Sequence, residues 1–414
     1  MNQEFNVWKI RQDFPMLRQL MHGRPFIYLD SAATTQKPQI VINAISDFYT
    51  KHYATVNRSV YDFASKASAH YNNIVRQKVK CFLNAAFVEE IIFTKSTTEA
   101  INLVAHCLGK LCLQPGDEVL ISEMEHHSNI VPWYMCCKER GAHLKVIPVN
   151  ESGELIFEEF QKLLSDKTKI VSIVHMSNVL GTINPIAEIV KEAHAKGAKV
   201  VVDGAQSAPH MFIDVQKLGV DFYAFSAHKM YGPTGLGVLY GKRSLLEIMP
   251  PYQGGGDMVD EVAFDRITYQ EPPLKFEAGT PMIAEVMGLG AALNYMEAID
   301  QKLIAVWEKD LLEYATQRLI EIKGLKIIGT AKQKGPILSF SIDGFHPLDL
   351  ATLLDLRGIA IRTGHLCAQP ILKRYHLSSL LRISLAFYNT FEEIDLFIHA
   401  LKEALLLLKP EISY

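Results

Sequence analysis

Lys229 lies in the stretch of the sequence best suited to covalent chemistry, FYAFSAHKMYGPTGLGVLY at positions 222–240. Two apolar runs, Phe222–Phe225 and Leu236–Tyr240, read as buried strands, and Lys229 falls in the polar loop between them. A lysine at the mouth of buried strands loses solvation, so its amine is more readily neutral and nucleophilic. Such an amine can form a Schiff base with an aldehyde cofactor such as pyridoxal phosphate. A solvent-facing loop lysine is the alternative, and the loop alone does not exclude it.

Other loops of the chain could hold the rest of such a cofactor. KSTTEAIN follows a strand and opens a helix, so Thr97 and Thr98 lie at a helix N-terminus, which favours a phosphate. Asp203 ends the apolar run KVVVD, three residues before Gln206, and a buried carboxylate of this kind needs a cation such as a pyridinium nitrogen. An ordinary N-cap and a turn-capping aspartate are the alternatives. His126 in SEMEHHSN could stack on a flat ring, although a lone histidine is more often structural.

The loop RTGHLCAQP, at positions 362–370, is a second group of candidate residues. Cys367 lies there beside His365 and Arg362, and positive neighbours favour the reactive thiolate. The remaining cysteines lie in helical or apolar contexts and read as small core residues. Arg382 opens the strand RISLAFYNT and could bind a carboxylate through two parallel hydrogen bonds, with an ordinary surface arginine as the alternative.

Strands and helices that alternate along the chain must position these residues. The predicted strands are short apolar runs after helical stretches, at Ile91–Thr94, Val119–Ser122, His143–Pro148, Ile170–His175 and Lys199–Asp203. This alternation predicts an α/β fold with a mainly parallel sheet covered by helices on both faces. Ligands bind beyond the carboxyl ends of the strands in such sheets. The polar residues Thr98, His126, Asn178 and Asp203 fall at those ends.

We divide the chain into an N-terminal segment (1–24) that packs on the small domain, a large domain (25–290) and a small C-terminal domain (291–414). A helix over 282–299 leads out of the large domain. Beyond it, strands at 325–328, 337–342, 359–362 and 381–385 and helices at 347–356 and 391–408 predict an α+β domain that carries Cys367.

Composition narrows the class of protein further. The 414 residues are 49% hydrophobic and 21% charged, which is ample for a buried core, and the net charge of −3 gives no sign of a nucleic-acid partner. We expect neither a signal nor a transit peptide, because the N-terminus is polar and acid-containing, and no apolar run reaches transmembrane length. The six cysteines form no CxxC pair and no disulfide framework, so we expect a reduced, cytoplasmic setting without a metal site.

At these residues the chain closely resembles the SUF-type (group II) cysteine desulfurases, which include selenocysteine lyase-like enzymes of the class V aminotransferase fold. The resemblance runs nearly end to end, through LDSAATTQKP, TTEAINLVA, EHHSNIVPW, SNVLGTINPI, VDGAQSAPH, SAHKMYGPTGLGVLY, EAGTP, GHLCAQP and LAFYNT. It implies the pyridoxal-phosphate-dependent transferase fold of the aspartate aminotransferase type, with a large mainly parallel-sheet domain and a small α+β C-terminal domain.

The resemblance also implies roles for individual residues. Lys229 would carry pyridoxal 5′-phosphate covalently, Asp203 and Gln206 would hold its ring, and His126 would stack on that ring and serve in catalysis. The residues implied to bind the phosphate are Thr98 (with Thr97 beside it), Ser226, His228 and, across a dimer interface, Thr280 of EAGTP. Cys367 matches the persulfide-forming cysteine and Arg382 the arginine that binds the substrate carboxylate, while Asn178 and Arg362 match residues lining the substrate side.

The implied activity is that of a homodimeric enzyme that converts L-cysteine to L-alanine. Its sulfur would pass to a persulfide on Cys367 and then to a protein acceptor for iron–sulfur cluster assembly. Selenocysteine lysis or another reaction on the same fold remains open, as does a non-catalytic sulfur-relay or scaffold protein. Transamination needs no thiol, so the Cys367 loop argues against it. The chain departs from the family at NRSVY (57–61), where HRGxH is usual, at Leu366, where a second histidine is common, and at Lys95-Ser96, where Arg-Gly is usual.

Overall fold

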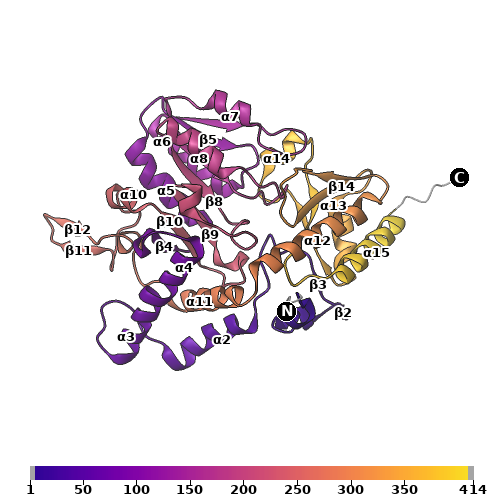
Figure 1. The fold of residues 1–414 in the computed structure, drawn as a ribbon, viewed down its shortest axis with the longest axis horizontal. Helices are drawn as coiled ribbons and strands as arrows, with labels where there is room; N and C mark the ends of the chain where they lie inside the picture. The colour runs from indigo at the N-terminus through magenta and orange to yellow at the C-terminus, as the bar shows by residue number, and fades with distance from the viewer. Residues whose placement is uncertain (1–4, 409–414) are drawn as a thin grey trace.

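A large mixed sheet forms the centre of the computed structural model, which describes residues 5–408 (Figure 1). Its strands are, in chain order, β4 (Ile91–Thr94), β5 (Glu118–Ser122), β6 (His143–Ile147), β7 (Thr168–Val174), β8 (Lys199–Asp203), β9 (Phe222–Ser226) and β10 (Gly237–Gly241). They lie in the order β4-β10-β9-β8-β7-β5-β6, and β10 runs in the direction opposite to the other strands of this sheet. The predicted mainly parallel sheet of an α/β fold is confirmed.

Both faces of this sheet are buried, because successive side chains of a strand point to opposite faces. Val200 and Val202 of β8 lie in one hydrophobic core, and Val201 lies in another on the opposite face. Helix α8 (Ile186–Ala195) packs into the first core and α5 (Thr97–Cys112) into the second. The strands therefore read as continuous apolar runs, as is typical of sheets covered on both sides. The other helices of this part of the chain are α2 (Gln39–Asp47), α3 (Asp62–Ser68), α4 (Arg76–Leu83), α6 (Val131–Arg140), α7 (Phe157–Leu163), α9 (Val215–Leu218) and α10 (Arg243–Ile248).

A second, antiparallel sheet follows in the C-terminal part of the chain. Its strands lie in the order β13 (Leu325–Ile328), β14 (Ile337–Ile342), β17 (Leu380–Ser384) and β16 (Arg362–Gly364). The helices around it are α12 (Gln301–Ile320), α13 (Pro347–Asp355), α14 (Gln369–Arg374) and α15 (Phe391–Leu407). Leu338, Leu381 and Ile383 pack with Phe397 and Leu401 of α15 in one core.

The N-terminal part of the chain lies against this second sheet (Figure 1). The short strand β3 (Ile27–Tyr28) pairs in parallel with β15 (Ile359–Ala360), which takes up the first half of the single strand expected over 359–362. Before it come α1 (Val7–Arg11), β1 (Leu20–Met21) and β2 (Arg24–Pro25). Arg11 forms an ion pair with Glu393 of α15 at 2.8 Å. The domain boundaries at 25 and 291 stay predictions, and the pairing of β3 argues for grouping residues 27–30 with the smaller sheet.

The link between the two sheets differs from the expected pattern. Helix α11 (Ile283–Glu297) matches the expected helix, but α12 follows it as a further helix that was not predicted. A hairpin of β11 (Val259–Val262) and β12 (Ile267–Tyr269) is likewise a feature for which the sequence analysis made no prediction. A π-helical segment, Ala69–Val75, lies between α3 and α4. Among residues 5–408, no helix has the length and apolar character needed to cross a bilayer.

Candidate active site

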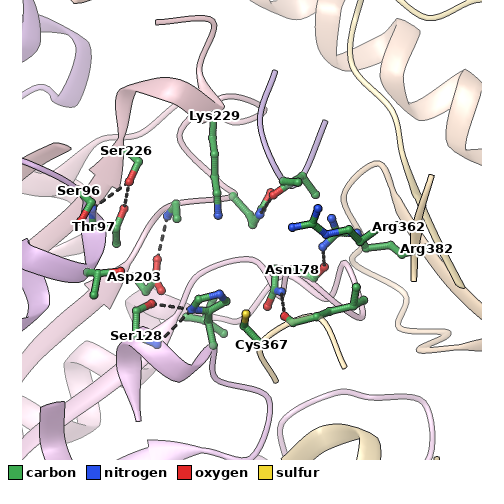
Figure 2. Close-up of a pocket in the computed structure, with 18 of the residues that line it drawn as sticks. Ser96, Thr97, Ser128, Asn178, Asp203, Ser226, Lys229, Arg362, Cys367 and Arg382 are labelled. Atoms are coloured by element: carbon green, nitrogen blue, oxygen red, sulfur yellow. Dashed lines mark hydrogen bonds between the residues drawn. The ribbon is translucent and has the colours of Figure 1, made fainter. Parts of the chain in front are cut away.

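A cavity of about 500 Å³ opens where the strands of the large sheet end and the C-terminal sheet begins (Figure 2). It brings together nearly all of the predicted site residues: Thr97, Thr98, His126, Asn178, Asp203, Gln206, Ser226, His228, Lys229, Arg362, Cys367 and Arg382. Thr280 does not line this cavity. It is exposed and lies in a separate hollow beside Phe93 and Glu277.

Lys229 ends a single helical turn, Ala227–Lys229, that directly follows β9. Figure 2 shows its side chain extending into the cavity, toward the space between Asp203 and Cys367. Burial lowers the pKa of Lys229 to about 8, while the nearby Asp203 carboxylate acts in the opposite direction. A substantial fraction of this amine is therefore unprotonated at neutral to mildly alkaline pH, as a nucleophile or a base requires.

Asp203 lies at the end of β8 and is only 2% exposed. Its carboxylate accepts a hydrogen bond from the N–H of Ala205 at 3.0 Å, but none of the salt bridges among residues 5–408 includes it. Burial raises the pKa of Asp203 above its ordinary value. A buried carboxylate without a cation is costly, so this site suits a ligand that brings a positive charge.

Gln206 and His126 border the same part of the cavity. The side-chain amide of Gln206 donates to the carbonyl of Ala32 at 2.7 Å, whereas its buried Oε1 has no partner. His126 accepts a hydrogen bond at Nδ1 from the N–H of Ser128, and burial lowers its pKa to about 3. A neutral, fixed imidazole, an orphaned amide oxygen and an unpaired carboxylate fit a flat ring with a protonated nitrogen.

The start of α5 forms another wall of the cavity. Ser96 is the N-cap of this helix, and its side chain accepts from the N–H of Glu99. The hydroxyl of Ser226 accepts from the N–H of Thr97 at 2.9 Å and lies 2.7 Å from the Thr97 hydroxyl. The expected helix N-terminus is thus present, with hydroxyl groups and a helix dipole that suit an anion. Burial lowers the pKa of His228, which lies nearby, to about 4 and so makes it neutral.

Cys367 lies opposite, in a loop with an uncommon backbone conformation. Leu366 and Cys367 have φ values of 52° and 54°, in the left-handed region that residues other than glycine rarely adopt. Hydrogen bonds hold this loop: the side-chain amide of Asn178 donates to the carbonyl of Leu366, and the N–H of His127 donates to that of Cys367, both at 2.8 Å. The thiol itself is exposed. Backbone strain maintained by surrounding contacts is common at functional sites.

His365 contributes a further hydrogen bond to this loop. Its Nδ1 accepts a hydrogen bond from the N–H of Cys367 at 3.1 Å, which requires that nitrogen to be unprotonated. This bond helps to fix the loop. Arg362 also lines the cavity close to Cys367 in the sequence.

Arg362 and Arg382 are directly opposite each other on β16 and β17. Like charges in such a cross-strand pair repel, and Asp30 offsets this repulsion. Its carboxylate accepts from Arg382 at 2.8 Å and lies 3.5 Å from Arg362. The Arg382 side chain is 3% exposed and also donates to the carbonyl of Asn178, while its buried Nε has no partner. Arg382 therefore keeps hydrogen-bonding capacity for a second carboxylate.

Two residues that support the site were missed by the sequence analysis. Asp30 ends the short apolar run at 26–30, and the reasoning that selected Asp203 at a strand end would also have selected it. Glu125 is fully buried and accepts from Asn129, Ser122 and the N–H of Val174, which anchors the start of the His126 loop. A glutamate within a predicted loop gave no signal of such burial.

The chain is similar to known proteins over nearly its whole length. The family model described as "Aminotransferase class-V" matches residues 27–397. A cysteine desulfurase of Synechococcus elongatus is 49% identical over 391 residues, which are 94% of this chain but 62% of that protein. A cysteine desulfurase of Dickeya dadantii is 48% identical over 394 residues, 95% of each chain.

A solved structure shares the fold. The cysteine desulfurase CsdA (S-sulfonic acid) from Escherichia coli superposes with a TM-score of 0.91 at 41% identity, covering 97% of this chain and 99% of that one. The predicted fold class is confirmed by this match. The chain belongs to the class-V aminotransferases and, among them, to the family of the cysteine desulfurases.

Proposed function

We propose that the protein is a cysteine desulfurase that uses pyridoxal 5′-phosphate to convert L-cysteine to L-alanine and retains the sulfur on Cys367. One observation carries this proposal: Lys229 with its lowered pKa, an unpaired buried carboxylate and an exposed cysteine all line one cavity. The relatives named above are called cysteine desulfurases, and the family depends on pyridoxal phosphate.

The residues on one side of the cavity would hold the cofactor. Lys229 would bind it covalently, and Asp203 would pair with its ring nitrogen and keep that nitrogen protonated. Gln206 would help to hold the ring, and His126 would stack on it. The phosphate-binding residues would be Thr97, Thr98, Ser226 and His228. When bound, the cofactor withdraws electrons from the α-carbon of the substrate and so makes its proton acidic.

The residues on the other side would bind and process the substrate. Arg382 would bind the substrate carboxylate, with Asn178 and Arg362 beside it. Nζ of Lys229 would accept the α-proton, for which its lowered pKa is suited. The Cys367 thiolate would then attack the substrate sulfur, forming a sulfur–sulfur bond as the carbon–sulfur bond breaks. The carbon fragment takes up a proton and leaves as alanine, and His126 would move protons between these groups.

The partners of the protein are part of the same proposal. A protein acceptor would take the sulfur from the exposed Cys367 for iron–sulfur cluster assembly. A homodimer is supported by Thr280, which lies outside the cavity of its own chain and is free to reach that of a partner. A cytoplasmic location is supported by the cysteines, all six of which lie in the described part of the chain as free thiols.

The experiment that tests the proposal is incubation of the protein, loaded with pyridoxal phosphate, with L-cysteine and a reductant. We expect alanine and sulfide to appear in equal amounts. A parallel reaction with L-selenocysteine compares sulfur with selenium. Pyruvate and ammonia in place of alanine, or no product from either substrate, would refute the proposal and favour another reaction or a non-catalytic role.

A further inference from the structure

The carbonyl oxygen of His228, in the peptide unit that precedes Lys229, accepts an unusual set of hydrogen bonds. Its donors are the N–H of Thr35 at 3.1 Å, the hydroxyls of Thr34 at 3.0 Å and Thr35 at 3.2 Å, and the amine of Lys37 at 2.7 Å. A carbonyl oxygen has only two lone pairs, so these donors hold it more firmly than an ordinary backbone contact. The position of this peptide unit is therefore strongly determined by residues 34–37.

The same segment also holds the chain on the other side of Lys229. The hydroxyl oxygen of Thr35 accepts from the N–H of Tyr231 at 2.8 Å. Tyr231 has a φ of 65°, which residues other than glycine rarely adopt, so this bond fixes a backbone that would otherwise relax. Hydrogen bonds from residues 34–37 therefore hold the backbone on both sides of Lys229.

Lys37 is an uncommon choice for a donor at this place. Its side chain is partly buried, and none of the salt bridges found among residues 5–408 includes it. Its amine donates to the carbonyls of Thr35 and His228, at 2.6 and 2.7 Å. Burial lowers the pKa of Lys37 to about 7, which reflects the cost of placing an ammonium without a counter-ion. This unfavourable burial argues that Lys37 has a specific role in the folded protein.

We propose that Lys37 is a positioning residue for Lys229: with Thr34 and Thr35 it fixes the peptide unit between His228 and Lys229, and thereby the point from which the Lys229 side chain enters the cavity. The inference rests on the proposed function, because it concerns the amine that would bond to the cofactor. A lysine side chain is flexible, so its reach and direction depend on where its Cα is held. A displacement of about 1 Å can slow a reaction about a hundredfold.

The test follows the covalent capture of pyridoxal phosphate by the cofactor-free protein. Samples are reduced with borohydride at timed intervals, and the label on the Lys229 peptide is measured by mass spectrometry. We expect Lys37→Met to slow this capture roughly tenfold or more. Lys37→Arg keeps a donor and should restore most of the rate. Thr35→Val removes the hydroxyl contacts to His228 and Tyr231 but keeps the backbone N–H donor to His228, and it should also slow the capture. This variant decides the test if Lys37→Met does not fold.

Lys334 provides a matched control within the same chain. It too is partly buried, donates to the carbonyls of Leu180 and Gly329, and has a pKa lowered to about 7 by burial, but it does not line the cavity. Lys334→Met should reduce the melting temperature while leaving the capture rate unchanged. Wild-type capture by the Lys37→Met protein, or equal slowing in both methionine variants, would overturn the inference. Failure of the wild-type protein to be labelled at Lys229 would instead refute the proposed function.

Discussion

Replacement of Arg382 by alanine should abolish most substrate binding while the cofactor remains bound. The Arg382 side chain is 3% exposed, and it faces the cavity with a buried Nε that has no partner. Its loss would leave the substrate carboxylate without its main partner in a desolvated site. Truncating one member of a buried hydrogen-bonded charge pair costs about 2–5 kcal/mol. Since about 1.4 kcal/mol corresponds to a factor of ten, kcat/KM should fall roughly 30- to 5,000-fold.

Arg362 provides the comparison, because it lies directly opposite on the neighbouring strand but is 53% exposed. Pairs formed by exposed charges contribute only about 0.2–1 kcal/mol, so Arg362→Ala should reduce kcat/KM by less than about sixfold. Arg382→Lys keeps the positive charge but not the two parallel hydrogen bonds, and its kcat/KM should lie between those of Arg382→Ala and the wild type.

Steady-state kinetics with L-cysteine gives these ratios, and the visible absorption of the bound cofactor shows whether the site is intact. A thermal unfolding curve is needed as well, because Arg382→Ala also leaves Asp30 with only the longer contact to Arg362. If Arg382→Ala changed kcat/KM less than threefold, or if Arg362→Ala cost more than Arg382→Ala, the assignment of the carboxylate-binding residue would be wrong.

Three further predictions concern the remaining groups of the site. Capture of pyridoxal phosphate by Lys229 should become faster as the pH rises and should level off above about 8, because only the unprotonated amine reacts. Borohydride trapping measures this rate, and a rate that keeps rising to about pH 10, as for an ordinary lysine, would contradict the lowered pKa. Cys367→Ser should retain the cofactor but release almost no sulfur from L-cysteine, with selenocysteine less affected; wild-type sulfide release would exclude the persulfide mechanism. The protein should sediment as a dimer and Thr280→Ala should weaken its retention of the cofactor, whereas a fully active monomer would rule out the shared phosphate site.

Most strands of the large sheet were predictable because they are buried on both faces and read as short apolar runs, although β6, at the edge of the sheet, is partly exposed. Helix α12 was harder to recognise, although its buried residues Ile304, Leu311, Ala315 and Leu319 recur at helical spacing. Glu308 lies among them, and only its buried contact with His210, at 2.9 Å, explains a carboxylate there. The β11–β12 hairpin has mostly exposed side chains, so no alternation of buried and exposed residues marks it.

Some residues of the candidate site could be identified from the sequence around them, whereas others depend on contacts between distant parts of the chain. Asp203 and Thr97 could be identified because a strand end and a helix start are visible in the sequence around them. The partner of Arg382 could not, since Asp30 is 352 residues away along the chain. The hydrogen bond from the Cys367 N–H to His365 could not be predicted either, because it depends on a backbone conformation that no motif reveals.

Residues 30–37 contact both the part of the cavity formed by the large sheet and the part formed by the C-terminal sheet. At one end of this segment, Asp30 holds Arg382 and Arg362 of the small sheet; at the other, Lys37 and the two threonines hold the backbone beside Lys229 of the large sheet. The segment spans only eight residues. It is also held from within, because the hydroxyl of Tyr388 lies 2.8 Å from that of Ser31 and accepts a hydrogen bond from the N–H of Gln36. One end of the segment thus contacts Arg382, and the other contacts the peptide unit before Lys229. We therefore expect the segment to set the distance between the Lys229 amine and Arg382. A substrate that met both groups would have its α-carbon placed by the backbone of residues 30–37.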